Sequence, residues 1–250
     1  MGRLVSPLCR VGRKKPIQDK VVRLSPKDIK IYVEPFVGTG DIFFAMSLDP
    51  EKVKSYINDK DSDVATAFKI MKSNPNIDNI GKFKDMSLEQ VKSFVKGSHS
   101  GLDKLAQIIY KLCATFGSTG QGKIYKDSNI EPKLRKMPLY AEYLKNTSIS
   151  NTDYKSLFSH DSPNTFFYLD PPYEKSKGLY KDAVIDYKQM VDRLKKLKGK
   201  FLLSINDSAE IRETFKDFRI IGLSVEGGAS GQKKNEIGVK SRKELFIKNY

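Results

Sequence analysis

The stretch Phe167-Tyr168-Leu169-Asp170-Pro171-Pro172-Tyr173 joins an apolar, strand-like run to a corner made of one acid, two prolines and an aromatic residue. Each proline fixes φ at about −65° and removes a backbone donor, so the corner is stiff. Asp170 and the Pro171 carbonyl are suited to accept hydrogen bonds from the two protons of a planar amino group, and Tyr173 offers a ring for base stacking. A proline turn after an edge strand is the alternative for a bare Pro-Pro pair.

A second motif lies upstream, Tyr32-Val33-Glu34-Pro35-Phe36-Val37-Gly38-Thr39-Gly40-Asp41, followed by an apolar helix start at 42–46. This strand-loop-helix layout is typical of nucleotide sites, where glycines let a ligand approach the backbone. The Gly-x-Gly pair alone is weak evidence, because the third glycine of the dinucleotide fingerprint is missing. A further strand ends in Asn58-Asp59, which puts an acid where the hydroxyls of a ribose would lie. Three strand ends therefore point to one crevice.

Apolar runs alternate with amphipathic ones along most of the chain, which favours an α/β sheet with helices on both faces. We expect helices at 17–24, 61–72 and 186–197, and strands at 31–36, 54–57, 166–169, 201–205, 218–225 and 245–247. The last two strands should pair in an antiparallel hairpin around the glycine-rich, basic stretch 227–240.

The segment from residue 74 to residue 147 departs from this alternation and is expected to be a mostly helical insertion, with helices at 87–96 and 102–113. A stretch rich in glycine, lysine and hydroxyl side chains follows at 115–126. It could lie along a nucleic-acid backbone while polar side chains reach base edges, or it could be a flexible connector. The residues that we associate with nucleic-acid contact are Ser118, Thr119, Gln121, Lys123, Lys126, Arg135 and Lys136.

The chain has 250 residues and a formal charge of +15, which suits a phosphate-binding surface but would also suit an anionic membrane or a ribosomal partner. No apolar run approaches the roughly 20 residues of a membrane span, and no signal-peptide pattern opens the chain, so we expect an intracellular, soluble protein. Two cysteines offer no disulfide framework, and two histidines offer no zinc site. We expect no metal.

Together these motifs and their order resemble the Dam-like (alpha-group) adenine-specific DNA methyltransferases, which use S-adenosylmethionine. In that group, too, the recognition segment lies between the cofactor loop and the catalytic corner. The matching stretches are the N-terminal motif from Ser6-Pro7-Leu8 to Lys14, the cofactor loop 34–40, the acid of Asn58-Asp59, the adenine-holding motif Asn151-Thr152-Asp153-Tyr154, the catalytic signature 170–173 and the closing strand 242–250.

The resemblance implies a Rossmann-like sheet with a reversed C-terminal strand. It implies a catalytic domain formed by 1–73 and 148–250, and a helical target-recognition domain at 74–147. The implied reaction is methyl transfer from S-adenosylmethionine to N6 of an adenine flipped out of duplex DNA. Short palindromes such as GATC are common targets of similar enzymes. A monomer or a weak dimer would suffice.

The resemblance also assigns residues to roles. Those implied to contact the cofactor are Lys14, Glu34, Pro35, Phe36, Gly38, Gly40, Asp59, Asp153, Tyr154 and Asp170. Those implied in catalysis are Asp170, Pro171, Pro172 and Tyr173. No metal is required, because the sulfonium is already an activated methyl donor.

One departure concerns the N-terminal motif, which usually has an aromatic residue followed by Gly-Gly-Lys. This chain has Arg10-Val11-Gly12-Arg13-Lys14, so Arg13 adds bulk where the backbone would approach the ligand. A solvated basic arm is the alternative for these residues. Two other classes of function stay open: methylation of another planar amine, such as adenine in RNA, cytosine N4 or a glutamine amide, and a catalytically idle DNA-binding subunit. Related families usually carry Ser or Asn in place of Asp170.

Overall fold

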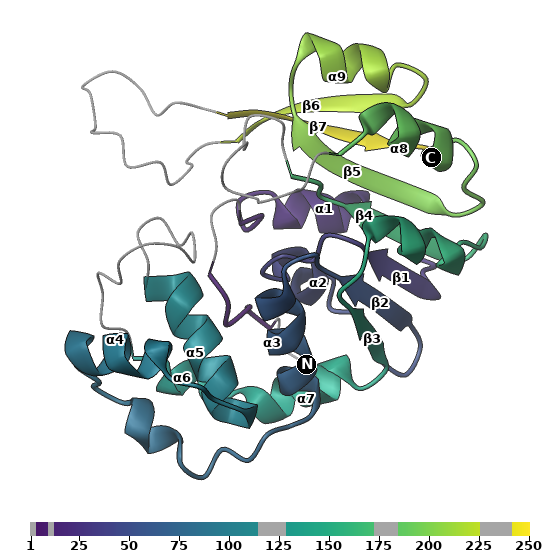
Figure 1. Ribbon diagram of the computed structural model, residues 1–250. Helices are drawn as coiled ribbons and strands as arrows, with labels where there is room; N and C mark the ends of the chain where they lie inside the picture. Colours follow the sequence, from purple (N-terminus) through teal and green to yellow (C-terminus); the bar gives the residue numbers. More distant parts are fainter. Residues whose placement is uncertain (1–3, 10–12, 115–128, 173–184, 226–241) are drawn as a thin grey trace, which may run out of the picture.

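A computed structural model of the chain describes residues 4–9, 13–114, 129–172, 185–225 and 242–250. The strands within these ranges are β1 (Ile31–Glu34), β2 (Lys54–Asn58), β3 (Thr147–Ser150), β4 (Thr165–Leu169), β5 (Lys200–Asn206), β6 (Arg219–Val225) and β7 (Arg242–Lys248). They form one sheet of order β3-β2-β1-β4-β5-β7-β6 (Figure 1). Strands β1 to β5 pair in parallel, whereas β7 pairs antiparallel with both β5 and β6. The predicted Rossmann-like sheet with a reversed C-terminal strand is confirmed.

Helices surround this sheet and extend beyond one end of it (Figure 1). They are α1 (Gln18–Leu24), α2 (Asp41–Met46), α3 (Ser62–Lys72), α4 (Leu88–Lys96), α5 (Gly101–Ala114), α6 (Glu131–Leu134), α7 (Met137–Leu144), α8 (Tyr187–Leu194) and α9 (Ala209–Thr214), with 3₁₀-helices η1 (Ile80–Phe83) and η3 (Tyr154–His160). Among the residues described, no helix is long and apolar enough to cross a membrane.

The two faces of the sheet bury different side chains because neighbouring residues in a strand point in opposite directions. In β4, Phe166 and Tyr168 join the core that contains α1, α2 and α3, whereas Phe167 and Leu169 join the core that contains η3, α8 and α9. All five residues of β4 are buried. A strand covered on both faces shows a continuous apolar run rather than an alternating one, which explains the sequence pattern.

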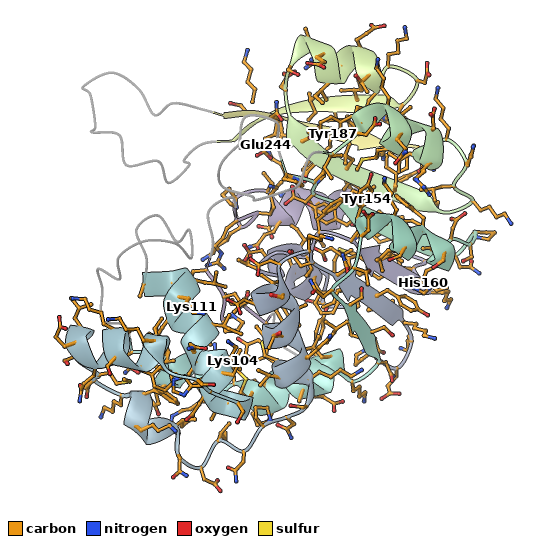
Figure 2. All side chains as sticks on the ribbon, in the orientation of Figure 1. Lys104, Lys111, Tyr154, His160, Tyr187 and Glu244 are labelled. Atoms are coloured by element: carbon orange, nitrogen blue, oxygen red, sulfur yellow. The ribbon has the colours of Figure 1, made fainter. Side chains whose placement is uncertain are left out.

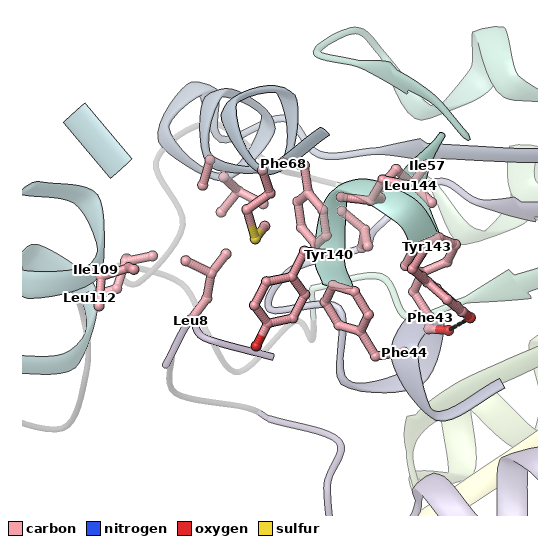
Figure 3. Close-up of a cluster of buried hydrophobic side chains, with 14 of the residues drawn as sticks. Leu8, Phe43, Phe44, Ile57, Phe68, Ile109, Leu112, Tyr140, Tyr143 and Leu144 are labelled. Atoms are coloured by element: carbon pink, nitrogen blue, oxygen red, sulfur yellow. Dashed lines mark hydrogen bonds between the residues drawn. The ribbon is translucent and has the colours of Figure 1, made fainter. Parts of the chain in front are cut away.

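The helical insertion shares a core with the sheet domain through aromatic side chains of α2 and α7 (Figure 3). The rings of Phe43 and Tyr143 meet edge to face with centroids 5.2 Å apart, and Phe44 and Tyr140 lie 5.4 Å apart. The Tyr143 hydroxyl also donates to the Phe43 carbonyl at 2.9 Å. The division into domains at 74–147 remains a prediction, and α7 packs on the sheet domain as well as on the insertion.

Most predicted elements are present within a few residues of their expected bounds. The expected hairpin strands pair as β6 and β7, and the stretch between them lies outside the described residues. Strand β3 was not predicted, because Thr147-Ser148-Ile149-Ser150 has a single apolar residue and lies at the edge of the sheet, where only β2 pairs with it.

Candidate active site

The candidate site lies where β1 is flanked by β2 on one side and β4 on the other, the point at which the strand order changes direction. In open parallel sheets, the loops that leave two such strands in opposite directions open a crevice at their carboxyl ends. The loop after β1 carries the Gly-x-Gly motif, β2 leads into Asp59, and β4 leads into Asp170. The fold thus brings the three predicted strand ends to one edge.

Asp170 is held from two sides. The Lys14 ammonium lies 2.7 Å from Asp170 Oδ1, with both side chains largely buried. From β5, the Ser204 hydroxyl donates to the same oxygen at 3.0 Å. The Ser204 proton is thereby engaged, so the Tyr168 hydroxyl, 2.8 Å from Ser204 Oγ, is the donor in that contact. Lys14 and Ser204 thus hold the carboxylate, and Tyr168 holds Ser204.

The proline corner is also braced. Tyr187, the first residue of α8, donates its hydroxyl to the Pro172 carbonyl at 3.0 Å. The Pro172 carbonyl therefore has a hydrogen-bond partner within the fold. Tyr173 lies outside the described residues, so its ring is not placed.

The loop after β1 contains two glycines with left-handed backbone. Gly38 has φ +50° and open space where a side chain would begin, whereas a Cβ on Gly40, at φ +76°, would lie 2.7 Å from the ring of Phe68. The Gly38 N–H donates to Asp59 Oδ2 at 2.8 Å, and Asp59 Oδ1 accepts from the Asp61 N–H at 2.9 Å. Gly38 thus borders open space, while Gly40 is required for packing.

Asn58 ties three strand ends together. Its side-chain amide donates to the Pro35 carbonyl at 3.0 Å and to the Thr152 carbonyl at 3.2 Å. Its Oδ1 accepts from the Thr152 N–H at 2.9 Å and from the Ser150 hydroxyl at 2.8 Å. The loop after β1 is therefore fixed against the turn that follows β3.

Glu34 contributes a buried carboxyl group to this edge. It is 2% exposed, and its Oε2 accepts a hydrogen bond from the Tyr32 hydroxyl at 2.7 Å. Burial raises the pKa of Glu34 well above its ordinary value, and repulsion from Asp170, Asp41 and Asp59 adds to the effect. Four carboxyl groups therefore lie at this edge, two of them paired with Arg13 and Lys14.

Tyr154 faces Phe36 across the loops, with ring centroids 5.0 Å apart, and lies on the same side of the sheet as Tyr187 (Figure 2). Its hydroxyl is buried and has no hydrogen-bond partner among the described residues. Burial also raises the pKa of Tyr154. Asp153 is exposed and caps η3 by accepting from the Lys155 N–H at 2.9 Å, so its carboxylate serves a local structural contact.

Arg13 lies against the start of α2 rather than in solvent. Its Nε donates to Asp41 Oδ2 at 3.0 Å, its Nη2 lies 2.5 Å from Asp41 Oδ1, and Thr39 Oγ1 donates to Asp41 Oδ2 at 3.0 Å. A bidentate arginine–carboxylate pair fixes orientation as well as charge. The interpretation of Arg13 as a solvated arm is wrong, and the N-terminal motif is bound to the Gly-x-Gly loop.

The predicted DNA-contacting residues are described only in part. Arg135 and Lys136 are exposed where α6 meets α7, and Arg135 pairs with Glu131. Ser118, Thr119, Gln121, Lys123 and Lys126 lie outside the described residues. An open hollow of about 460 Å³, partly lined by lysines, lies at the opposite, amino end of β1, β2 and β3, away from the candidate site.

The sequence did not indicate Ser204, Tyr168 or Asp41 as parts of the site. One usable signal exists for Ser204, because it is the sole hydroxyl in the buried run Phe201-Leu202-Leu203-Ser204-Ile205. A buried polar group needs a partner, and a lone one in an apolar strand deserves a search for it. Nothing local indicates that Asp41 would pair with Arg13.

Known proteins resemble this chain over most of its length. A family model of D12 class N6 adenine-specific DNA methyltransferases matches residues 11–99 and 105–225. The type II methyltransferase M1.LlaDCHI of Lactococcus lactis subsp. cremoris is 25% identical over 273 aligned residues, covering 96% of this chain and 93% of that relative. The type II methyltransferase M.MjaIII of Methanocaldococcus jannaschii is 24% identical over 200 residues, covering 65% of this chain and 67% of that one.

Two solved structures are similar in outline at low identity. A precorrin-6y C5,15-methyltransferase from Geobacter metallireducens has a TM-score of 0.45 at 9% identity, covering 98% of this chain and 97% of that one. An O-methyltransferase from Thermotoga maritima has a TM-score of 0.44 at 13% identity, covering 96% and 66%. Membership rests instead on the family model, which spans well over half of the sequence: the chain belongs to the D12 class of N6 adenine-specific DNA methyltransferases.

Proposed function

We propose that this DNA methyltransferase transfers a methyl group from S-adenosylmethionine to N6 of an adenine flipped out of duplex DNA, within a short palindrome such as GATC. The observation that carries the proposal is the fixed Asp170 carboxylate, which Lys14 and Ser204 hold at the carboxyl ends of the neighbouring strands β1 and β4. An acceptor held in place before the substrate arrives costs no reorganisation during the reaction.

The residues present fit the proposed cofactor. Gly38 leaves open space at the loop, and the acidic groups around Glu34 suit a ligand that carries a sulfonium and an ammonium. The buried Tyr154 hydroxyl, beside the Phe36 ring, suits a heterocycle that has its own hydrogen-bonding groups. Asp59 would hold the ribose hydroxyls while it braces the Gly38 N–H.

When bound, the cofactor supplies a methyl group on a positively charged sulfur, already activated for displacement. The carboxylate of Asp170 and the Pro171 carbonyl accept hydrogen bonds from the two N6 protons and turn the nitrogen lone pair out of conjugation with the ring. With the amine held in this way, the cofactor would supply the methyl group to N6, and the N6 proton that Asp170 accepts as a hydrogen bond would pass to water. Lys14 and Ser204 keep Asp170 in position throughout.

Recognition of DNA is assigned to the helical insertion. Arg135 and Lys136 present exposed positive charge there, and the stretch that contains Ser118, Thr119, Gln121, Lys123 and Lys126 follows α5 in the sequence. Lysines and arginines would contact phosphates, while the hydroxyl and amide side chains would contact base edges. Since the residues proposed for the site come from a single chain, we propose a monomer or a weak dimer.

A substrate-class assay tests this function directly. The protein would be incubated with tritiated S-adenosylmethionine and, in parallel, with duplex DNA, single-stranded DNA and RNA of the same sequence. We expect label in the duplex arm, recovered as N6-methyladenine. Modified-base sequencing of DNA from expressing cells then reports the target sequence. Preferential labelling of RNA, or of cytosine, would contradict the proposal, and absence of label in every arm would indicate an idle subunit.

A further inference from the structure

The two cysteines of the chain lie together, far from each other in sequence. Lys133, which precedes the end of α6 by one residue, places its Nζ 3.4 Å from Cys9 Sγ and 3.2 Å from Cys113 Sγ. Two sulfurs that share one ammonium at these distances are at most about 6.6 Å apart, by the sum of the two distances. Both cysteines are free and partly exposed, so a small molecule can reach them.

The backbone around Cys9 is fixed, so this proximity is built into the fold. The Pro7 carbonyl accepts from Lys133 Nζ at 3.0 Å and lies 3.7 Å from Cys113 Sγ. The Tyr140 hydroxyl donates to the Val5 carbonyl at 2.7 Å, and Leu8 is fully buried. Figure 3 shows Leu8 among the side chains of Phe68, Ile109, Leu112 and Tyr140. The N-terminal segment is thus anchored on α5, α6 and α7.

We propose that Cys9 and Cys113 form an oxidation site, at which a peroxide converts the two thiols to a disulfide that links the N-terminal segment to α5. Cys9 is the attacking group. Its sulfur displaces hydroxide from the peroxide as the oxygen–oxygen bond breaks, and a sulfenic acid forms. Cys113 then attacks the Cys9 sulfur, a sulfur–sulfur bond forms, and water leaves. In sum, two thiols and one hydrogen peroxide give one disulfide and two waters.

The electrostatics around the pair explain why Cys9 attacks and Cys113 resolves. A hydrogen bond from Cys113, together with the positive charges of Lys133 and Arg13, lowers the pKa of Cys9 to about 6 against the cost of burial. The pKa of Cys113 is raised, mainly by its hydrogen bond with Cys9 and by burial. The thiolate is the reactive form of cysteine, so Cys9 is the nucleophile at neutral pH.

The cysteine pair joins two regions that have roles in the proposed function, on which this consequence rests. Cys9 belongs to the segment that continues to Arg13, paired with Asp41, and to Lys14, paired with Asp170. Cys113 is the penultimate residue of α5, directly before the stretch assigned to DNA recognition. Oxidation would therefore fix the N-terminal segment against the helical insertion by a covalent bond.

Peptide mapping after peroxide treatment tests the proposal. The protein would be treated with hydrogen peroxide, blocked with iodoacetamide and cleaved with trypsin, which releases Cys9 in peptide 4–10 and Cys113 in peptide 112–123. We expect these two peptides joined by a disulfide, in monomeric protein, and separated by dithiothreitol. The oxidised protein should also melt on the order of 5–10 °C higher, because the cross-link closes a long loop. Unlinked peptides, or a link between two chains only, would overturn the proposal.

The reactivity of one single and two double variants separates this chemistry from packing alone. In Cys113→Ser, the pH of half-maximal alkylation of Cys9 should still lie below the ordinary thiol value, because Lys133 and Arg13 remain, and peroxide should leave a sulfenic acid that dimedone traps. In Cys113→Ser/Lys133→Met, the pH of half-maximal alkylation of Cys9 should rise by about one unit or more, and alkylation at neutral pH should slow on the order of tenfold. Cys113→Ser/Lys92→Met, which removes a half-buried lysine of α4 that pairs with Glu89, should match Cys113→Ser. Equal profiles in all three proteins would contradict the role of Lys133.

Discussion

Lys14 and Asp170 form a largely buried ion pair, with 2.7 Å between Nζ and Oδ1, that joins the N-terminal motif to the corner after β4. Lys14 belongs to the N-terminal motif and Asp170 to the proline corner. The sequence indicates these motifs separately, and the ion pair connects them. Lys14 was assigned to the cofactor by resemblance alone. Its position beside Asp170 indicates that it orients the carboxylate that is proposed to hold the substrate amine.

Lys14→Met should lower the single-turnover rate of methyl transfer on the order of 10²-fold. The substitution leaves a carboxylate in a low-dielectric site without its charged partner, so Asp170 loses its position or takes up a proton. Lys15→Met is the matched control, because Lys15 is the exposed neighbour, and it should stay within about twofold of the wild type. A Lys14→Met rate equal to the control would remove Lys14 from the site.

Gly38→Ala and Gly40→Ala should fail for different reasons. At Gly38 the left-handed backbone costs about 1–2 kcal/mol, and the methyl group enters space proposed for the cofactor, so affinity for S-adenosylmethionine should fall. At Gly40 the added Cβ also meets the Phe68 ring, so the free energy of unfolding should fall further. Calorimetry and urea unfolding measure the two quantities. Gly81→Ala, with no positive φ and no close neighbour, is the control.

Glu34→Gln should stabilise the protein increasingly as pH rises. Burial raises the folded-state pKa of Glu34 well above its ordinary value of 4.5, so the stability associated with its bound proton is fully present below 4.5. It is lost as pH rises from there through the folded-state pKa. Urea unfolding at several pH values should therefore show the variant gaining on the wild type towards neutral pH. Glu89→Gln should not show this gain, because Lys92 lowers the pKa of that exposed carboxyl.

Basic and polar residues of the proposed recognition region should have different effects on DNA binding. Lys123→Ala, Lys126→Ala and Arg135→Ala should weaken binding to all DNA sequences and reduce the salt dependence by about one unit of slope per lost phosphate contact. Changes at Ser118, Thr119 or Gln121 should alter discrimination between cognate and near-cognate sites by about 1–3 kcal/mol. Binding curves across salt concentrations decide this, with Lys216→Ala, an exposed lysine just after α9, as the control. If neither the basic nor the polar substitutions change DNA binding, the stretch 115–126 only connects two helices.

The sequence predicts those parts of the fold and of the candidate site that are determined by residues adjacent in the chain. The proline corner, the Gly-x-Gly loop and the acid after β2 are local patterns, and so are the strands buried on both faces. The contacts that complete the site are not local: Ser204 reaches Asp170 only because β5 lies beside β4, and Arg13 reaches Asp41 only because the N-terminal segment packs on α2. Such contacts depend on packing rather than on residue type.

The most direct test of the account is the single-turnover methylation rate of Asp170→Ala on duplex DNA at saturating S-adenosylmethionine, with cofactor affinity measured alongside. Asp217→Ala, which removes an exposed acid that pairs with Lys195, is the control. We predict a loss on the order of 10²–10³-fold or more for Asp170→Ala, cofactor binding that is still measurable, and an unchanged control. An Asp170→Ala rate within about threefold of the wild type would contradict the assignment of the substrate amine to this carboxylate.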